Sequence, residues 1–579
     1  MNKQNNDRMA GTWRLYLVYF TLTLCVGVIG WKVSSLHIVE RDFLQGQGDA
    51  RTIRTEPIVA HRGIITDRNG EPLAVSSPVQ SIWLNPRQIN GDLEAIGRLA
   101  REMGLNPDVL ANNIAANPER EFLYVKRRLP PVEAERVLGL GIPGVYAQQE
   151  YQRYYPQGEV VAHLVGFTNV DDQGQEGLEL AFDDWLSGKP GSRRVMKDRR
   201  GNIIEELLIL ETAEPGRNLQ LSIDSRIQNL AYRELKAEFI KRRAKSATAV
   251  VLDVQSGEVL AMVNQPSYNP NNKAGISDFE VLRNRALTDT FEPGSTVKPF
   301  TIATALESGL YNTASKIETR GWMMVGKYEV KDSLNYGELS LERIITKSSN
   351  VGAAKIALQL GPETIRDMLS RVGFGTVTGS GFPGERSGVL PPIRVGWSRI
   401  ETATLSFGYG LTSTAMQLAE AYSVLADRGH RKPVSLLKLD EEAIAALPRE
   451  PVISEKISRQ VTQMLETVVD PGKGGTAAEA RVPYYSVAGK TGTARVVGES
   501  GYQQNVHNSL FVGMVPARDP KIVVVVIVNE PKGDEHYGGQ VSAPVFSRIS
   551  SGAMRLLNVP PDQLLDGKES KDNRGAGEP

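Results

Sequence analysis

One long apolar run near the N-terminus interrupts the otherwise mixed pattern of hydrophobic and polar residues along the 579-residue chain. Residues 15–31 read LYLVYFTLTLCVGVIGW and carry no charge. As a helix rising ~1.5 Å per residue, they cover about 26 Å of the ~30 Å hydrocarbon core of a bilayer. Trp13 and Trp31 bracket the run, and the flank 1–14 is net positive, as expected of a cytoplasmic segment. We therefore predict a cytoplasmic segment over 1–14 and one transmembrane helix over 15–33.

A cleaved signal peptide is the alternative interpretation of this run. The apolar part of a signal peptide is typically shorter, and no small-residue cleavage site of the A-x-A kind follows Trp31. We favour an uncleaved anchor, which places residues 34–579 outside the cytoplasm.

After the anchor, the pattern changes once more, at the turn signal Glu214-Pro215-Gly216. Before it, residues 34–215 mix polar helical stretches with extended ones, and this region is predicted to be a pedestal domain. Its first part, 33–54, is interpreted as a polar helical stalk, and residues 61–74 as a hairpin around an Asn-Gly turn. Two polar helices are expected near 92–116 and 131–139.

Residues 216–560 place apolar strands at both ends of a helical middle. This order predicts an α+β fold in which one antiparallel sheet is flanked by helices and joins the two ends of the domain. The polar tail 561–579 is expected to be disordered. The expected strands are 219–223, 247–254, 258–264, 485–488, 509–515 and 522–528, and the expected helices are 224–241, several within 295–470, and 543–557.

Composition and charge exclude several classes of function. Lys+Arg and Asp+Glu both number 67, so no global positive field exists to hold a nucleic-acid backbone, and we expect no nucleic-acid partner. The single cysteine, Cys25, lies in the predicted anchor, which excludes an intramolecular disulfide and a multi-cysteine metal site. The six histidines form no H-x-x-x-H pair. We expect neither a metal nor another cofactor.

Ser295 and Lys298 form an S-x-x-K motif in the segment FEPGSTVKPF. The turn Pro293-Gly294 places Ser295 where a helix begins, and residues i and i+3 share a helix face, so the lysine amine can reach the serine hydroxyl. This is the geometry of a serine nucleophile activated without histidine. A simple helix cap is the alternative for Ser295 taken alone. The motif recurs at 435–438, in a VSLLK run typical of an ordinary strand.

Lys490-Thr491-Gly492 is the only K-[ST]-G sequence in the chain, and it follows the apolar run YYSVA, so it is predicted to lie on a strand. A lysine, a hydroxyl and a glycine along a strand edge suit the capture of a C-terminal carboxylate. A surface strand that ends in a turn is the alternative.

The sequence S-x-N occurs at 267–269, 333–335 and 348–350, and only the last two lie between Ser295 and Lys490. Ser348 and Asn350 lie where two helical patterns meet, a place that would hold polar side chains rigidly. Residues 333–335 lie in a turn-rich loop, so we assign the second motif to Ser348 and Asn350.

Together, S-x-x-K, S-x-N and K-T-G, separated by 53 and 142 residues, resemble the motifs of the penicillin-recognising serine enzymes. With the anchor and RGIITDRNGEPLA at 62–74, the chain from about 13 to 560 resembles the class B penicillin-binding proteins. Residues 166–183 and 407–429 are most similar to their division-specific, FtsI-type branch. The resemblance implies that 34–215 is a dimerisation-type pedestal and that 216–560 is a transpeptidase domain with a fold like that of serine β-lactamases.

The resemblance also implies catalytic roles. Ser295 would attack the D-Ala–D-Ala carbonyl of a peptidoglycan stem peptide, and Lys298 would take its proton. The acyl group would then pass to an amine of a neighbouring stem, which forms a cross-link. Ser348 and Asn350 would support proton transfer and hold the substrate amide.

For substrate binding, the resemblance implies that Lys490 and Thr491, with Gly492 beside them, bind the terminal carboxylate of the substrate or of a β-lactam. The backbone N–H groups of Ser295 and Thr493 would form the oxyanion hole. An unperturbed lysine has a pKa of about 10.4 and is a poor base at pH 7. A second ammonium nearby, together with burial, would lower that pKa.

The implied partners are peptidoglycan stem peptides, lipid-linked nascent strands, β-lactam antibiotics, the membrane, an FtsW-type septal glycosyltransferase and other division proteins. The implied location is the inner (cytoplasmic) membrane, crossed once, with the N-terminus in the cytoplasm and the catalytic domain in the periplasm.

Other functions fit the sequence less well. A β-lactamase or β-lactam sensor shares the motifs but has about half this length, and the class A sequence E-x-x-L-N is missing between 350 and 490. A bifunctional synthase needs E-D-x-x-F, and the chain contains no Glu-Asp dipeptide. A non-enzymatic septal scaffold is disfavoured by the intact Ser295, Lys298 and Lys490. An elongation-type transpeptidase is the main rival of the division-type interpretation.

Overall fold

The computed structural model describes residues 4–43, 52–89, 91–197, 203–274, 276–498 and 501–563. Contacts divide the chain into two compact units, which we describe separately. The predicted boundary near 215 assigns 62–77 and 151–187 to the pedestal, whereas in the structure these segments pack with the C-terminal part. Unit 1 consists of Met1–His61, Pro78–Glu150 and Gly188–Pro215, and unit 2 of Arg62–Ser77, Tyr151–Ser187 and Gly216–Pro579.

Unit 1 begins with the helix α1 (Gln4–Ser34), which continues into a π-helical turn, Ser35–Val39. The stretch Trp13–Val39 is the one helix of the described chain that is long and apolar enough to cross a membrane, and none of it is buried in the protein. Its threonine hydroxyls donate to backbone oxygens one turn earlier, as Thr21 Oγ1 does to Leu17 O at 2.7 Å. Such internal hydrogen bonds suit an apolar surrounding.

The predicted stalk over 33–54 is helical in the first of its described parts and extended in the last. Helical structure extends to residue 43, residues 44–51 lie outside the described part of the chain, and strand β1 (Ile53–Ile58) then begins.

The small core of unit 1 packs helices against strands β3 (Pro72–Leu84) and β4 (Leu123–Leu129). The single helix predicted near 92–116 is in fact two, α4 (Leu93–Glu102) and α5 (Pro107–Ala115). Asn106 separates them because its side chain caps the second helix, with Pro107 at the first helical position. The helix predicted at 131–139 is confirmed as α6 (Pro131–Leu138).

A three-stranded sheet in unit 1 has the order β1-β8-β9. Its strands β8 (Gly191–Lys197) and β9 (Ile203–Glu211) pair antiparallel. All nine residues of β9 are exposed, including the isoleucines and leucines of IIEELLILE. The glutamates spaced along this edge strand oppose edge-to-edge association.

Unit 2 is built around a five-stranded antiparallel sheet of order β12-β11-β21-β20-β19. Strand β11 pairs with β21 in a regular register, so that the first and last parts of the unit meet in the sheet. The run VVVVIV is fully buried in β21, as predicted, and the α+β fold is confirmed. The five strands are β11 (Ser246–Asp253), β12 (Val259–Gln265), β19 (Ala488–Gly498), β20 (Gly501–Val515) and β21 (Ile522–Asn529).

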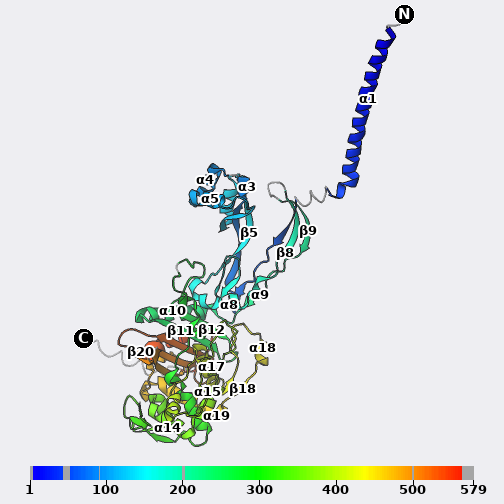
Figure 1. The fold of residues 1–579 in the computed structure, drawn as a ribbon. Helices are drawn as coiled ribbons and strands as arrows, with labels where there is room; N and C mark the ends of the chain where they lie inside the picture. Colours follow the sequence, from blue (N-terminus) through cyan, green and yellow to red (C-terminus); the bar gives the residue numbers. More distant parts are fainter. Residues whose placement is uncertain are drawn as a thin grey trace, which may run out of the picture. The chain divides into compact units, whose positions relative to one another are not determined.

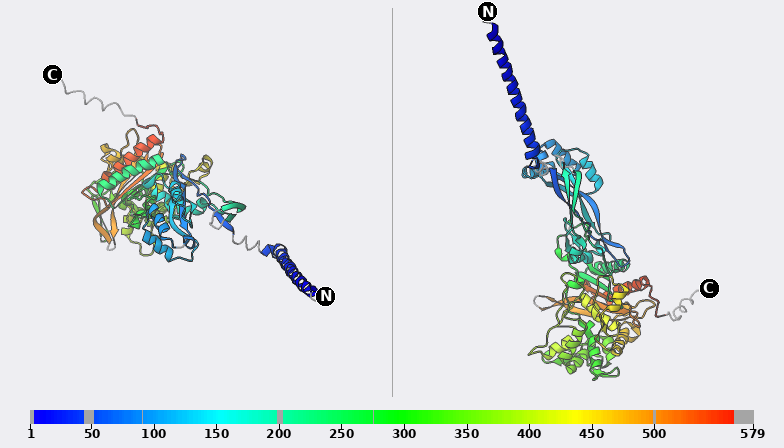
Figure 2. Two further views of the ribbon diagram at one scale, coloured as in Figure 1. Left: turned by 90° about the horizontal axis from the view of Figure 1, so that it is seen from above. Right: turned by 90° about the vertical axis from the view of Figure 1, so that its right-hand side faces the viewer.

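Helices cover both faces of this sheet. On one face, α10 (Ser225–Arg242) and α20 (Gly538–Leu556) lie side by side, as the left view of Figure 2 shows in green and red. Phe511 of β20 contacts Phe546 of α20 there, with ring centroids 4.7 Å apart. The helices α17 (Ala415–Ala426) and α19 (Glu455–Val469) pack on the sheet from the opposite side to α10 (Figure 1).

Two other predictions hold closely in unit 2. The hairpin expected over 61–74 is present, because β2 (Ile65–Thr66) pairs antiparallel with the start of β3 around Gly70, whose φ is +89°. Asp224 caps α10, accepting a hydrogen bond from Arg226 N.

Several predicted boundaries differ from the structure. The strand expected at 219–223 is only β10 (Leu219–Gln220). Strand β20 begins at Gly501, eight residues before the predicted start, because its exposed end carries polar residues that hide the strand pattern. Helix α20 begins at Gly538 rather than at the predicted residue 543. Its first two residues are glycines, which are poor helix formers, so the sequence did not indicate this start.

The predicted disordered tail begins with ordered contacts. Asp562 accepts a hydrogen bond from Ser486 N at 2.7 Å. Residues 564–579 lie outside the described part of the chain.

Candidate active site

The first motif lies on a short turn that leads into a helix. Ser295 is in the 3₁₀ turn η4 (Gly294–Val297), and Lys298 is the first residue of α12 (Lys298–Glu307). Gly294 has a φ of +55°, and its N–H donates to Gly408 O at 3.0 Å. The turn is held from below by Tyr422 of α17, whose hydroxyl donates to Thr296 O at 2.7 Å. These hydrogen bonds fix the turn that carries Ser295, which is half-buried.

The second motif lies at the junction of two helices, as predicted. Helix α13 (Leu341–Lys347) ends at Ser348, and α14 (Asn350–Leu360) begins two residues later. Ser348 has a φ of +56°, a left-handed conformation that is uncommon for a residue with a side chain. Such strain persists only where the surroundings impose it, and it is frequent at functional sites.

The third motif lies on β19, the last strand in the order of the sheet. Lys490 is fully buried, and Thr491 is only 9% exposed. The Thr491 hydroxyl contacts that of Thr476 at 2.9 Å. The interpretation of K-T-G as part of a strand is therefore confirmed.

The three motifs meet through two buried lysines. Lys298 Nζ donates to Ser348 O at 2.5 Å, to Ser348 Oγ at 3.2 Å and to Asn350 Oδ1 at 2.7 Å. Lys490 Nζ also donates to Ser348 Oγ, at 3.1 Å. The Ser348 hydroxyl is thus shared between the two amines.

The described contacts of Lys298 are with the second motif, and the approach of its amine to the Ser295 hydroxyl stays a prediction. A neutral lysine amine has two N–H groups and one lone pair, whereas the ammonium has three donors. The three acceptors around Lys298 Nζ match the ammonium. When Lys298 is neutral, Ser348 Oγ can instead donate to it.

Burial and repulsion both lower the pKa of Lys298 well below its ordinary value. Desolvation is the larger cause, and the neighbouring Lys490 is the second, while Asp332 acts in the opposite direction. Burial also lowers the pKa of Lys490 to about 7. A lysine with such a pKa is available as a base near neutral pH.

The edge strand β19 passes very close to the turn that carries Ser295. A Cβ on Gly492 would lie 2.9 Å from Thr296 Cγ2 and 3.1 Å from Pro293 O, so only glycine permits this approach. Side chains alternate along a strand, so Thr493 points to the other face, where its hydroxyl accepts from Gly538 N at 3.2 Å. The backbone of residues 492–493 is therefore the part of β19 beside Ser295.

Asp332 is a component of the site that sequence reasoning missed. It follows β15 (Tyr328–Lys331), and its carboxylate accepts from Asn350 N at 2.6 Å and from Ser349 Oγ at 2.6 Å. Only its separation from the S-x-N motif is visible in the sequence, and no spacing rule connects the two. The supporting Tyr422 was missed for the same reason.

The alternative motifs do not join this centre in the described contacts. Ser435 Oγ donates to Leu437 O at 2.8 Å, in an extended segment that bridges to residue 258. Ser333 Oγ contacts the Tyr336 hydroxyl at 2.8 Å, in a turn. Among the described residues, no group of three or more His, Cys, Asp or Glu side chains is arranged to hold a metal ion.

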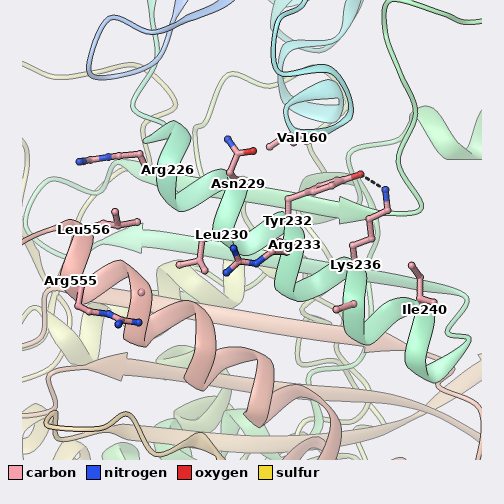
Figure 3. A pocket seen from close by; sticks show the side chains of 12 residues that line it. Val160, Arg226, Asn229, Leu230, Tyr232, Arg233, Lys236, Ile240, Arg555 and Leu556 are labelled. Carbon is pink, nitrogen blue, oxygen red and sulfur yellow. Dashed lines mark hydrogen bonds between the residues drawn. The ribbon is translucent and has the colours of Figure 1, made fainter.

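A large open hollow lies on a different part of unit 2. It has a volume of about 840 Å³ and lies between α10 and α20, where Tyr232 and Lys236 form a hydrogen bond at its wall (Figure 3). The lining contains no residue of the three motifs. The helices α10 and α20 cover one face of the sheet, and Gly492 approaches the turn with Ser295 on the other face. The hollow is therefore separate from the catalytic centre. Its lining is Val160, Arg226, Asn229, Leu230, Tyr232, Arg233, Lys236, Ala237, Ile240, Gly552, Arg555 and Leu556.

Comparison with protein families finds two matches along the chain. The family described as penicillin binding protein transpeptidase domain matches residues 247–551, and the family described as penicillin-binding protein dimerisation domain matches residues 57–221.

Individual relatives are similar over almost the whole chain. The probable peptidoglycan D,D-transpeptidase PbpC of Pseudomonas aeruginosa is 44% identical, covering 98% of this chain and 99% of the relative. The peptidoglycan D,D-transpeptidase FtsI of Escherichia coli is 43% identical, with 98% and 96% covered. Among solved structures, the TP domain of Burkholderia pseudomallei penicillin-binding protein 3 is 42% identical with a TM-score of 0.54, covering 59% of this chain and 98% of that one.

Proposed function

Since this chain belongs to the class B penicillin-binding proteins of the FtsI type, we propose that it is a membrane-anchored D,D-transpeptidase whose nucleophile is Ser295. Its substrate would be the D-Ala–D-Ala end of a peptidoglycan stem peptide. The observation that carries the assignment of residues is the sharing of the Ser348 hydroxyl between Lys298 and Lys490, next to the turn with Ser295.

In the acylation step, Ser295 Oγ attacks the carbonyl carbon of the penultimate D-Ala, and its proton passes to neutral Lys298. The peptide bond then breaks, and the terminal D-Ala leaves after its nitrogen takes up a proton. Ser348 Oγ, between the two lysines, is the group that would relay this proton. Asn350, whose Oδ1 accepts from Lys298, would hold the lysine and the substrate amide in place.

The developing negative charge would be held by the backbone N–H groups of Ser295 and Thr493. Support for this role is the close approach of β19 to the turn at Gly492. Such preorganised donors stabilise a tetrahedral oxyanion because they need no reorganisation during the reaction. Lys490 and Thr491, on the same edge strand, would bind the terminal carboxylate.

In the second step, an amine of a neighbouring stem attacks the ester carbonyl. The bond to Ser295 Oγ breaks as the new amide forms, and the serine recovers a proton from the attacking amine through Lys298. A β-lactam ring opens on Ser295 to give a corresponding ester, and the amine expelled from the carbonyl stays attached to the rest of the acyl group. Penicillin is therefore a direct probe of the first step.

Mass spectrometry of the penicillin adduct tests the assignment. We expect one adduct, on Ser295, and no labelling of Ser295→Ala, whose fold should survive because the half-buried Ser295 side chain caps no helix. Ser435→Ala, in the second S-x-x-K sequence, is the matched control and should label normally. An adduct on Ser435 or Ser348, or one that persists in Ser295→Ala, would refute the assignment.

We further propose that the enzyme acts at the division septum with an FtsW-type glycosyltransferase and other division proteins, and on lipid-linked nascent strands. The similarity to FtsI over nearly the full length supports this role. A fluorescent fusion should gather at the septum in dividing cells, and it should do so with catalytically inactive Ser295→Ala as well. Distribution along the side wall would favour the elongation-type alternative.

The proposed topology places the N-terminus in the cytoplasm and unit 2 in the periplasm, anchored in the inner membrane. The apolar helix Trp13–Val39 and its net positive N-terminal flank support it. A reporter that is active only in the cytoplasm should be silent when fused to the C-terminus. Activity of that fusion would contradict the topology.

A further inference from the structure

Asp332 lies outside all three motifs, yet it binds the backbone and side chains around the second one. Its Oδ1 accepts from Asn350 N at 2.6 Å and from Val351 N at 3.0 Å, and its Oδ2 accepts from Ser349 Oγ at 2.6 Å. Three donors on one carboxylate make a firm clamp, because hydrogen bonds to an ionised acceptor are about twice as strong as neutral ones.

The clamp acts where the backbone is under strain. Ser348 is in the left-handed region, and the residues that follow it start α14. The Ser349 side chain caps this helix through Gly352 N, and Asp332 holds the same side chain from outside. The residue before Asp332 also binds Asn350, since Asn350 Nδ2 donates to Lys331 O at 3.0 Å. The segment 331–332 therefore determines where the Asn350 side chain lies.

Asn350 transmits this constraint to the catalytic lysine. Its Oδ1 accepts from Lys298 Nζ at 2.7 Å, so the carboxylate, the asparagine and the lysine form one chain of contacts. Two charged groups act on Lys298. Lys490 lowers its pKa, and Asp332 raises it. The carboxylate thus opposes the effect of the second lysine.

We propose that Asp332 is a positioning residue for acylation, which fixes Ser349 and Asn350 against Lys298 and places a negative charge beside this group of contacts. This inference rests on the proposed function of Ser295 and Lys298. Asp332 does not touch the reacting atoms, and its effect passes through Asn350 and through the electrostatic field.

Two substitutions separate the two contributions. Asp332→Asn keeps an oxygen that accepts from the backbone N–H groups, and Ser349 Oγ can accept from the new amide, but the charge is lost. Without the anion, the pKa of Lys298 falls, so the neutral lysine persists to lower pH. Asp332→Ala loses both the charge and the clamp. A purely structural role would change the rate without moving its pH dependence.

The experiment measures the second-order rate of acylation by a fluorescent penicillin between pH 5 and 10, with the full-length protein in detergent. For Asp332→Asn we expect the acid limb to move to lower pH, because the carboxylate raises the pKa of Lys298. At a pH below the midpoint, the variant should therefore reach a severalfold larger fraction of its plateau rate than wild type does. The plateau itself should stay within about threefold of wild type, whereas Asp332→Ala should lower it at least tenfold, as expected when a positioning group is lost.

The matched control is Asp440→Asn, which removes the charge of a carboxylate that also accepts from a backbone N–H at a helix start, that of α18 (Glu441–Ala446). It should move neither the plateau nor the acid limb. The inference would be overturned if the pH profiles of both Asp332 variants coincided with that of wild type. It would also be overturned if Asp332→Asn lowered the plateau rate without moving the acid limb. Labelling that persists in Ser295→Ala would instead overturn the proposed function, so the two failures are distinguishable.

Discussion

Replacing Lys490 with a neutral side chain of similar length should shift the pH dependence of acylation, so that a higher pH is needed for the same fraction of the plateau rate. Lys298 and Lys490 both contact Ser348 Oγ, at 3.2 and 3.1 Å, so their Nζ atoms lie no more than 6.3 Å apart. Two unit charges about 6 Å apart repel by roughly 2.8 kcal/mol at an effective dielectric constant of 20. Removing this repulsion raises the pKa of Lys298. Lys490→Met removes this repulsion and keeps most of the buried volume.

The sign of the effect follows from the base form of Lys298. Lys490 depresses the pKa of Lys298, so wild type retains neutral Lys298 to comparatively low pH. In Lys490→Met that pKa rises, and the acid limb of the acylation profile should move to higher pH. Because the pKa of Lys490 itself is about 7, its charge and the expected difference are greatest below pH 7. The variant should also bind the penicillin carboxylate more weakly at every pH.

The assay is the rate of penicillin acylation across the pH range. Lys490→Arg is the control, because arginine stays charged throughout the range and should keep the pKa of Lys298 low. Its acid limb should therefore not move up, whatever happens to the plateau. Lys490→Gln provides a second neutral variant, and thermal unfolding shows which variants are folded. The electrostatic reasoning would be refuted if Lys490→Met and Lys490→Gln lowered the acylation rate equally at every pH and kept the midpoint of the wild-type acid limb.

Three further predictions follow from other contacts. Gly492→Ala should strongly reduce acylation, because its Cβ would lie 2.9 Å from Thr296 Cγ2, whereas Gly97→Ala, in open space on α4, should not. Glu179→Gln should lower the free energy of unfolding by about 3–5 kcal/mol in thermal or denaturant melts, since it leaves the buried Arg62 and Arg153 without their shared carboxylate. A 216–560 fragment should still bind labelled penicillin, since a solved TP domain is similar to this part of the chain. It should unfold at a lower temperature than the full-length protein, because β10 loses its pairing with β2. A folded fragment that fails to bind penicillin would contradict the first expectation.

The three motifs of the candidate site could be recognised in the sequence because each depends on short-range spacing. Ser295 and Lys298 are three residues apart, and Lys490, Thr491 and Gly492 are contiguous, so local structure alone brings each set to one place. The apolar helix and the buried strand β21 were also predictable, since an uninterrupted apolar run has few alternatives. The left-handed conformation of Ser348 and the polar, exposed start of β20 were not, because neither leaves a pattern of hydrophobic residues.

Tertiary structure alone decided how far the separate motifs cooperate. Lys298 and Lys490 are 192 positions apart in the chain. Only the packing of α12 against α14, and of the turn η4 against β19, places both amines on the Ser348 hydroxyl. The same holds for Asp332, which accepts three hydrogen bonds from residues 349–351, and for Tyr422, which donates one to Thr296 O. It also holds for segments 62–77 and 151–187, which pack with the C-terminal unit. Periodicity records which face of an element is buried, but the partner that buries it is determined only when the whole chain folds.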